Sequence, residues 1–307
     1  ERKVGDKIYM DVHSTDSSCL QEEGTNKWYK INTKYRSAEK ITKMVDARGL
    51  LELLAKNMAQ NAEPGIQFID MAKYWSNSDY VYDENAEYDS RILSTNACSE
   101  QYLSRESLCV LASINCAKFS TNIDLYESEL TKIGDSINRF LDNVNEMEYR
   151  DNTFATPHQK LAIRNLRRTG AGVTNIAGWL FKNNVEYGSN DGNDKISHFI
   201  ERYNYHLYRS SIDLGKEKGN FGLFNREKFE KSPFIKHMIS LGLKFETMRN
   251  VTCSSIAPTG SLTLMFRDFP MSYGVEPAFG MYFWKRTRIT GQYEYYFCVP
   301  SVVREYF

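Results

Sequence analysis

The chain has 307 residues, of which 41% are hydrophobic and 13% aromatic, a composition typical of a folded globular protein. Its 39 basic residues are balanced by 39 acidic residues, so the overall charge predicts neither direct nucleic-acid binding nor an acidic tail. No apolar run approaches the roughly 20 residues needed to cross a bilayer, and no apolar signal core follows the first charged residues. We therefore expect a cytoplasmic protein that does not contact a membrane.

The six cysteines are too few and too widely spaced for a disulfide scaffold, and none of them belongs to a C-x-x-C pair. We expect them to be reduced at rest and available for chemistry. The five histidines show no metal-ligand spacing, so the sequence predicts no metal site.

Hydrophobic periodicity predicts three long helices. Apolar residues recur at intervals of three and four over residues 38–60, where Ser37 is a candidate cap. The same pattern extends over residues 130–147 and 196–214, and Gly219 is expected to close the third helix.

Three short apolar segments predict strands, at residues 66–70, 251–257 and 278–283. Residues 76–90 and 95–100 have no regular periodicity and are expected to form loops, where reactive groups are commonly placed. Helices that alternate with short strands favour an α/β fold with mostly parallel pairing. We assign residues 1–34 to an irregular N-terminal segment and residues 35–307 to one domain or part of one.

The first candidate site is the segment 94–101, in which an amide, a thiol and a carboxylate occupy alternate positions. In extended backbone, Asn96, Cys98 and Glu100 would project to the same side. A hydrogen-bonding group, a redox-capable sulfur and a general base would then meet on one ligand. The alternative is a buried structural cysteine flanked by turn residues.

Three further segments carry weaker signals. Cys109 lies in an apolar, strand-like run and by itself indicates core packing. Residues 255–261 end a predicted strand in a turn with hydroxyls and free N–H groups, which suits a phosphate, although a plain Pro-Thr-Gly turn is the alternative. The glycines of residues 170–172 lack the third glycine of a dinucleotide-binding fingerprint.

In this order, these segments are similar to the large subunit of ribonucleotide reductases, most of all to the adenosylcobalamin-dependent class II. The family usually has Asn-Pro-Cys-Gly-Glu-Gln at the radical-cysteine loop, followed by a second cysteine and Ser-Ile-Asn. The matching segments are 63–70 (EPGIQFID), 96–101 (NACSEQ), 109–115 (CVLASIN), 168–173 (RTGAGV), 257–261 (APTGS) and 274–277 (GVEP). Ala97 replaces the usual proline and Ser99 the usual glycine, so the stiffness of the loop backbone is expected to differ.

The resemblance implies a ten-stranded α/β barrel built from two half-barrels, with the radical cysteine on a finger loop in its centre. Residues 35–307 would form part of that barrel. Cys98 would become a thiyl radical that takes the 3′-hydrogen of a ribonucleotide. Asn96 would hold the sugar hydroxyls, and Glu100 would accept the 3′-hydroxyl proton while the 2′-hydroxyl leaves as water. Cys109 would be one of two thiols that supply electrons and close into a disulfide.

The resemblance also assigns substrate binding and partners. Thr95 would bind the substrate beside the finger loop, and the hydroxyls of Thr259 and Ser261 would meet its phosphates. Pro258 and Gly260 complete that phosphate loop. The expected cofactor is adenosylcobalamin, and the expected partners are a ribonucleoside di- or triphosphate, a thioredoxin-type reductant and another chain or segment that completes the barrel. Dimer formation is left open.

Parts of the family pattern have no counterpart in the sequence. The second redox cysteine of the family lies far upstream of the finger loop, and Cys19 is too close to that loop to match it. An allosteric nucleotide domain, the first half-barrel and a C-terminal dithiol tail are also not recognised. We therefore expect a fragment, a split-gene product or an engineered chain.

Two alternatives remain. The first is the large subunit of a metal-dependent class I reductase, which receives its radical from a separate subunit through tyrosines. Tyr295 and Tyr296 form a candidate pair, but they follow the Gly-x-Glu-Pro turn too closely for the family position. The second alternative is a catalytically silent nucleotide-binding or assembly module that keeps the barrel without the reaction.

Overall fold

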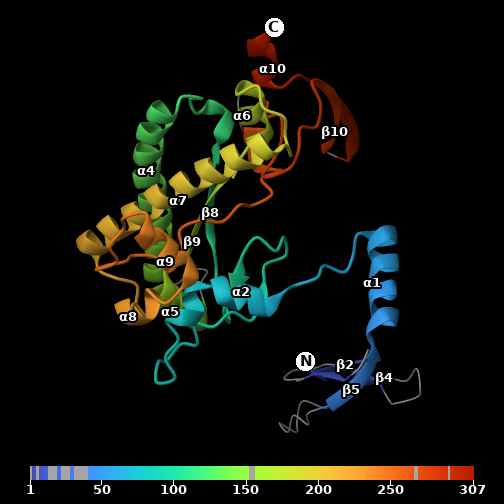
Figure 1. Cartoon of the computed structure of the whole chain (residues 1–307), viewed down its shortest axis with the longest axis vertical. Coiled ribbons are helices and arrows are strands. Elements are labelled where there is room, and N and C mark those ends of the chain that lie inside the picture. The colour runs from blue at the N-terminus through green and yellow to red at the C-terminus, as the bar shows by residue number, and fades with distance from the viewer. Residues whose placement is uncertain are drawn as a thin grey trace. The chain divides into compact units, whose positions relative to one another are not determined.

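The computed structural model describes residues 2–4, 7–12, 19–21, 28–30, 41–151, 156–265, 269–289 and 291–307, with the backbone alone before residue 46. The chain divides into two compact units, Glu1–Phe68 and Ile69–Phe307. Both contain helices and strands, so the expected α/β class is confirmed (Figure 1). Among the described helices, none is long and apolar enough to cross a membrane.

The first unit is a small antiparallel sheet followed by a helix. Its elements are β1 (Arg2–Val4), β2 (Lys7–Val12), β3 (Cys19–Gln21), β4 (Trp28–Lys30), β5 (Ile41–Asp46) and α1 (Ala47–Asn61). Strands β1, β2 and β5 form one sheet, and β3 pairs with β4. Residues 1–34, predicted to be irregular, therefore contain four of the described strands.

The helix predicted over residues 38–60 begins only at Ala47, so its first third was wrong. Residues 41–46 form β5 instead, because all six pair with β2 and exchange their backbone hydrogen bonds with it. Asp46 begins the helix, since its carboxylate accepts the N–H groups of Arg48 and Gly49. Ser37, the predicted cap, lies outside the described residues.

The second unit holds the remaining elements. Its helices are α2 (Ile69–Trp75), α3 (Asn77–Tyr80), α4 (Ile123–Arg150), α5 (Pro157–Leu166), α6 (Ile176–Lys182), α7 (Asn190–Lys218), α8 (Arg226–Phe229), α9 (Pro233–Ser240) and α10 (Ser301–Tyr306), with 3-10 turns η1 (Cys116–Lys118) and η2 (Leu262–Met265). Its strands are β6 (Ser94–Thr95), β7 (Tyr102–Leu103), β8 (Val110–Asn115), β9 (Thr169–Thr174), β10 (Phe283–Ile289) and β11 (Gln292–Cys298).

Two of the predicted strands were wrong. Helix α2 begins within the segment 66–70, because a short apolar run does not distinguish a strand from a helix by periodicity. The strand predicted over residues 278–283 begins only at Phe283, where antiparallel pairing with β11 starts. The region 76–90 is irregular as predicted, apart from the single turn of α3.

The centre of the second unit is a pair of parallel strands, β8 and β9, and every residue of β9 is buried. The predicted strand at residues 251–257 lies along the other side of β9 as extended chain. The N–H groups of Thr169 and Ala171 donate to the carbonyls of Thr252 and Cys253, and Ala171 and Ser254 form a parallel bridge. Three extended segments therefore lie side by side in the core.

Glycines permit this close approach. A Cβ at Gly172 would lie 2.2 Å from the carbonyl oxygen of Ser255, and a Cβ at Gly170 would lie 2.8 Å from the Cβ of Ser255. No side chain larger than hydrogen fits between the two backbones at these positions. The glycines at 170 and 172 therefore serve strand packing.

The predicted helices at residues 130–147 and 196–214 are confirmed as α4 and α7, and Gly219 caps α7 as predicted. The two helices pack against each other beside the strands (Figure 1). A Cβ at Gly134 of α4 would lie 3.3 Å from the backbone of His206 on α7, so the helices approach closely there. Apolar side chains on their facing sides, including Leu130, Leu141 and Leu207, belong to the main core.

A buried carboxylate joins α4 to the residues that precede β9 and to those that precede the extended segment 251–257. Asp142 is fully buried and lies 2.9 Å from the guanidinium of Arg167, just before β9, and 3.1 Å from that of Arg249, just before the extended segment. Lys218 at the end of α7 lies 3.4 Å from the same carboxylate. Since a buried charge is tolerated only when it is paired, this cluster fixes where the segments enter the core.

The expectation of mostly parallel pairing was wrong. The described strands form five small sheets, of which only the β8–β9 sheet is parallel. Hairpins account for β6–β7 and β10–β11, because a short connection can join only antiparallel strands. Within the described residues, no sheet closes into a barrel, and the ten-stranded architecture is not confirmed.

Gly172→Ala is expected to lower the free energy of unfolding by about 1–3 kcal/mol, because the added methyl group would overlap a backbone carbonyl that cannot rotate away. Gly65→Ala is the control, since a Cβ there meets nothing within 4 Å. Denaturant unfolding followed by circular dichroism measures both variants. Equal stability of the two would contradict the packing argument.

Candidate functional site

The predicted finger loop is the tip of a small hairpin. Thr95 of β6 pairs with Tyr102 of β7, and residues 96–101 connect them. The N–H of Asn96 donates to the carbonyl of Gln101 at 3.1 Å, and the N–H of Gln101 donates to the side-chain oxygen of Asn96 at the same distance. Asn96 therefore closes the loop through its own side chain.

The loop is not extended, so the premise that its alternate residues share one side was wrong. The N–H of Ser99 donates to the carbonyl of Asn96, which makes a tight turn around Cys98. Ser99 adopts the left-handed conformation, with φ of 61°, at the position where the resemblance expects glycine. The turn exposes Cys98 at its tip, and its thiol is free.

The base of the loop is anchored in the core. The hydroxyl of Ser255 donates to the carbonyl of Glu100 at 3.0 Å, and the side-chain amide of Gln101 packs over Gly170. The oxygen Oε2 of Glu100 and the oxygen Oε1 of Gln101 are buried and accept no hydrogen bond from the described residues. The base of the loop therefore holds two buried acceptors without a partner among the described residues.

Cys109 lies one residue before β8 and is half-buried. Burial raises the pKa of its thiol to about 12, the positive charge of Arg168 lowers it, and the negative charge of Glu100 raises it. Glu100 therefore acts electrostatically on Cys109. The hairpin and the start of β8 form one neighbourhood.

The predicted phosphate loop lies at the other end of the strands. Thr259 is buried and left-handed, with φ of 58°, which is rare for a β-branched residue. Its hydroxyl lies 2.9 Å from that of Thr174, the last residue of β9, and accepts the N–H of Gly274 at 3.0 Å. Pro258 and Ser261 are exposed and Gly260 is half-buried, and a short 3-10 turn, η2, follows.

The structure thus joins sequence segments that are far apart. The Gly-Val-Glu-Pro turn packs against the phosphate loop, because a Cβ at Gly274 would lie 2.9 Å from the carbonyl oxygen of Ala257. The finger loop and the phosphate loop are both attached to residues 255–259, the shared segment. The hydroxyl of Ser255 donates to the carbonyl of Glu100 in the finger loop, and the hydroxyl of Thr259 lies against that of Thr174 at the end of β9. Four residues of extended chain span at most about 14 Å, which is the scale of a nucleotide.

The family model described as ribonucleotide reductase, barrel domain, matches residues 4–305. The chain belongs to this family.

Relatives agree with the assignment. The chain is 29% identical over 289 residues to the vitamin B12-dependent ribonucleoside-diphosphate reductase of Thermoplasma acidophilum, covering 92% of this chain and 33% of the relative. It is 25% identical to the protein of the same name from Mycobacterium tuberculosis, covering 80% of this chain and 31% of the relative. The chain therefore spans about a third of the length of these reductases.

A solved structure supports the fold. The alpha subunit of the Actinobacillus ureae class Id ribonucleotide reductase superposes with a TM-score of 0.58 at 22% identity, covering 75% of this chain and 39% of that subunit. At this identity the likeness concerns the fold alone.

Sequence reasoning gave no role to three residues around the candidate site. Ser255 ties Glu100 to the core, Thr174 pairs with Thr259, and Arg168 acts on Cys109. Arg168 carried a signal, because it begins the segment 168–173 that matches the family. Ser255 and Thr174 carried none, since their roles depend on contacts across 155 and 85 residues of sequence.

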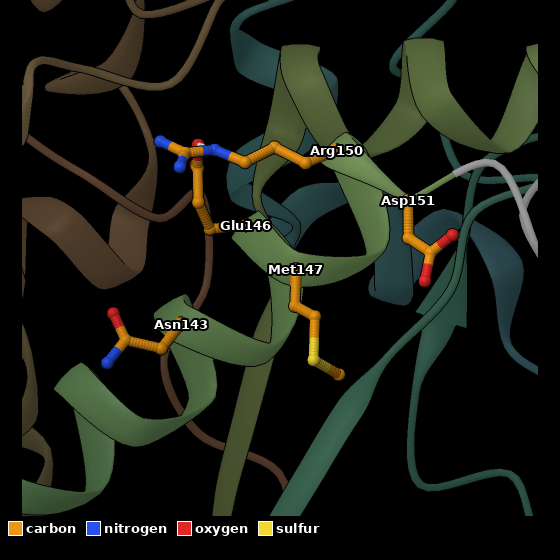
Figure 2. Close-up of a pocket in the computed structure, with 5 residues that line it drawn as sticks. All are labelled: Asn143, Glu146, Met147, Arg150 and Asp151. Atoms are coloured by element: carbon orange, nitrogen blue, oxygen red, sulfur yellow. Dashed lines mark hydrogen bonds and ion pairs between the residues drawn. The ribbon is translucent and has the colours of Figure 1, made fainter.

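Other features lie apart from the candidate site. Tyr295 and Tyr296 are exposed on the β10–β11 hairpin. A surface hollow near the end of α4 is lined by Asn143, Glu146, Met147, Arg150 and Asp151, and none of these is a predicted site residue (Figure 2). In the part of the chain that the structure describes, no three histidine, cysteine or acidic side chains cluster as metal ligands.

Thr259→Val is expected to lower the free energy of unfolding by about 1–3 kcal/mol, because it leaves the buried hydroxyl of Thr174 without its partner and leaves the N–H of Gly274 only the longer contact to the carbonyl of Pro258, at 3.4 Å. Thr259→Ser keeps the hydroxyl and is the matched control. Thermal unfolding compares the two variants. A serine variant as unstable as the valine variant would show that the hydroxyl contacts do not hold the loop.

Proposed function

We propose that this chain is the part of a ribonucleotide reductase that reduces the ribose, with Cys98 as the residue that becomes a thiyl radical. The observation that supports this most is the shared segment, which links the loop of Cys98 and Glu100 to the loop of Thr259. A ribose beside Cys98 and its phosphates at the Thr259 loop would fit that spacing. The family membership of the chain supports the same chemistry.

The residues of the finger loop would divide the chemistry between them. The Cys98 radical takes the 3′-hydrogen of the ribose. The carboxylate of Glu100 accepts the 3′-hydroxyl proton, and its oxygen Oε2 makes no hydrogen bond with the described residues. Asn96 uses its side-chain oxygen within the loop, which leaves its amide N–H groups to hold the sugar hydroxyls.

Cys109 would be one of the two thiols that supply electrons. When the C2′–O bond breaks, the hydroxyl leaves as water. The two thiols lose two electrons and two protons and form a disulfide, so that the nucleotide gains the hydrogen that replaces the hydroxyl. No cysteine of this sequence is proposed as the second thiol, because Cys19 is too close to the finger loop to match the family position; the side chain of Cys19 lies outside the described residues.

The relatives named vitamin B12-dependent make adenosylcobalamin the proposed cofactor. The exposed thiol of Cys98 fits a radical source that approaches from outside the hairpin, and Cys98 is the side chain that would face it. When bound, adenosylcobalamin supplies the radical that removes the hydrogen atom from this thiol.

The remaining assignments are part of the same proposal. The substrate is a ribonucleoside diphosphate, the reductant is a thioredoxin-type dithiol, and further polypeptide completes a ten-stranded barrel around the finger loop. Residues 35–307 are the proposed extent of the barrel segment. Thr95, Pro258, Gly260 and Ser261 would line the substrate together with Thr259.

Cys98→Ser is expected to abolish deoxyribonucleotide formation, because an alcohol does not form the radical that takes the 3′-hydrogen. The assay uses the protein that contains this chain, a ribonucleoside diphosphate, a dithiol and adenosylcobalamin. Cys298→Ser is the matched control, since that thiol is buried at the end of β11, outside the proposed site. Its activity is expected to equal that of the parent protein.

Two outcomes would contradict this proposal. Unchanged product formation in Cys98→Ser would remove the radical role of that residue. Nucleotide binding without turnover, with adenosylcobalamin or with a metal-containing radical subunit, would favour a silent binding module. Turnover that requires the metal subunit would assign the chain to the metal-dependent class.

A further inference from the structure

Arg168 is a buried arginine whose charge has no direct counterion among the described residues. The residue is only 6% exposed to solvent and stands directly before β9. One terminal nitrogen donates to the hydroxyl of Ser78 at 3.1 Å, and Nε has no hydrogen-bond partner among the described residues. A buried guanidinium normally lies against a carboxylate, so this arrangement requires an explanation.

The neighbouring residue shows the usual arrangement. Arg167 lies 2.9 Å from the carboxylate of Asp142 and 3.0 Å from that of Glu146. Adjacent arginines therefore enter opposite environments, one neutralised by two acids and the other facing away from them. The positive charge of Arg168 is therefore left to act on groups outside this acidic cluster.

The strand register aligns Cys109 with Arg168. Val110 pairs with Thr169 at the start of the parallel β8–β9 ladder. One residue earlier on each strand, Cys109 and Arg168 stand at corresponding positions just outside this ladder. Continued extended chain would bring their side chains to the same face of the sheet.

The other charged or titratable groups around the pair are few. Glu100 acts on Cys109 from the finger loop. Asp79 of α3, Tyr88 and Tyr208 of α7 act on Arg168, and burial raises the pKa of Asp79 and of both tyrosines. The carboxylate of Asp79 accepts the N–H of Ile92.

We propose that Arg168 is the electrostatic partner of Cys109 and stabilises the thiolate form of its sulfur. In this role it is a positioning residue that acts through the thiol. Its importance for turnover rests on the proposed function, but its effect on the sulfur does not.

The proposed catalytic cycle contains a step that a positive charge beside Cys109 would assist. After ribose reduction, Cys109 is in a disulfide, and an external dithiol must reduce it. A thiolate of the dithiol attacks the partner sulfur, the disulfide bond breaks, and its electron pair leaves on Cys109. The second thiol of the dithiol then displaces the first, so that the dithiol is oxidised and two thiols are regained. A leaving thiolate departs faster when a cation stabilises it.

The test is the rate at which iodoacetamide alkylates Cys109, measured by mass spectrometry across pH 7 to 10 in the full chain. Arg168→Gln is expected to slow alkylation about threefold or more. A loss of one pKa unit of stabilisation lowers the thiolate fraction tenfold, and the higher nucleophilicity of the more basic thiolate offsets part of that loss. The rate is expected to be lower at every pH in this range, which lies below the pKa of the thiol, and Arg168→Lys is expected to restore part of it.

Two other thiols serve as internal controls, because Cys98, Cys109 and Cys253 fall on different tryptic peptides. Cys98 is exposed and reports the reactivity of the reagent, whereas Cys253 is fully buried and reports opening of the core. Both rates are expected to stay constant in the variants. Unchanged or faster alkylation of Cys109, with Cys253 still protected, would overturn the proposal.

A second measurement leaves Arg168 in place, in case its replacement opens the core. Cys109→Asp puts a fixed anion beside the arginine, and Cys109→Asn is its neutral counterpart of equal size. The aspartate variant is expected to have the higher thermal midpoint at pH 7. A lower midpoint than that of the asparagine variant would overturn the proposal. Neither experiment requires turnover, so a failure of the reductase assay would leave both interpretable.

Discussion

The close approach of the segment 251–256 to β9 is the constraint on which the second unit depends. It exists because Gly170 and Gly172 carry no side chain toward Ser255. With the two backbones in contact, β9 is buried along its whole length and bonds to extended chain on both sides. Helices α4 and α7 then pack beside this central layer, and their apolar faces join its core.

The same contact assembles the candidate site. Ser255 reaches the carbonyl of Glu100 from one end of the shared segment, and Thr259 reaches Thr174 at the other end. A reactive loop and a phosphate loop on separate flexible connections would each have to be ordered at an entropic cost. Attachment to one rigid segment fixes their spacing before any ligand binds.

Charge is distributed unevenly around the start of β9. Asp142 and Glu146 neutralise Arg167 and Arg249, and this cluster anchors α4 to two chain segments. Arg168 takes no part in this cluster and donates instead to the hydroxyl of Ser78. Its positive charge and the negative charge of Glu100 both act on Cys109.

The sequence by itself determined the order of the candidate reactive segments and the long helices α4 and α7, because short motifs carry the first and local apolar spacing carries the second. Tertiary structure decided the rest. Residues 41–46 became a strand through pairing with β2, and Asn96 closed a turn where an extended segment was expected. The contacts of Ser255 and the isolation of Arg168 also depend on segments distant in sequence, and local patterns carry no information about which distant backbone will supply a partner.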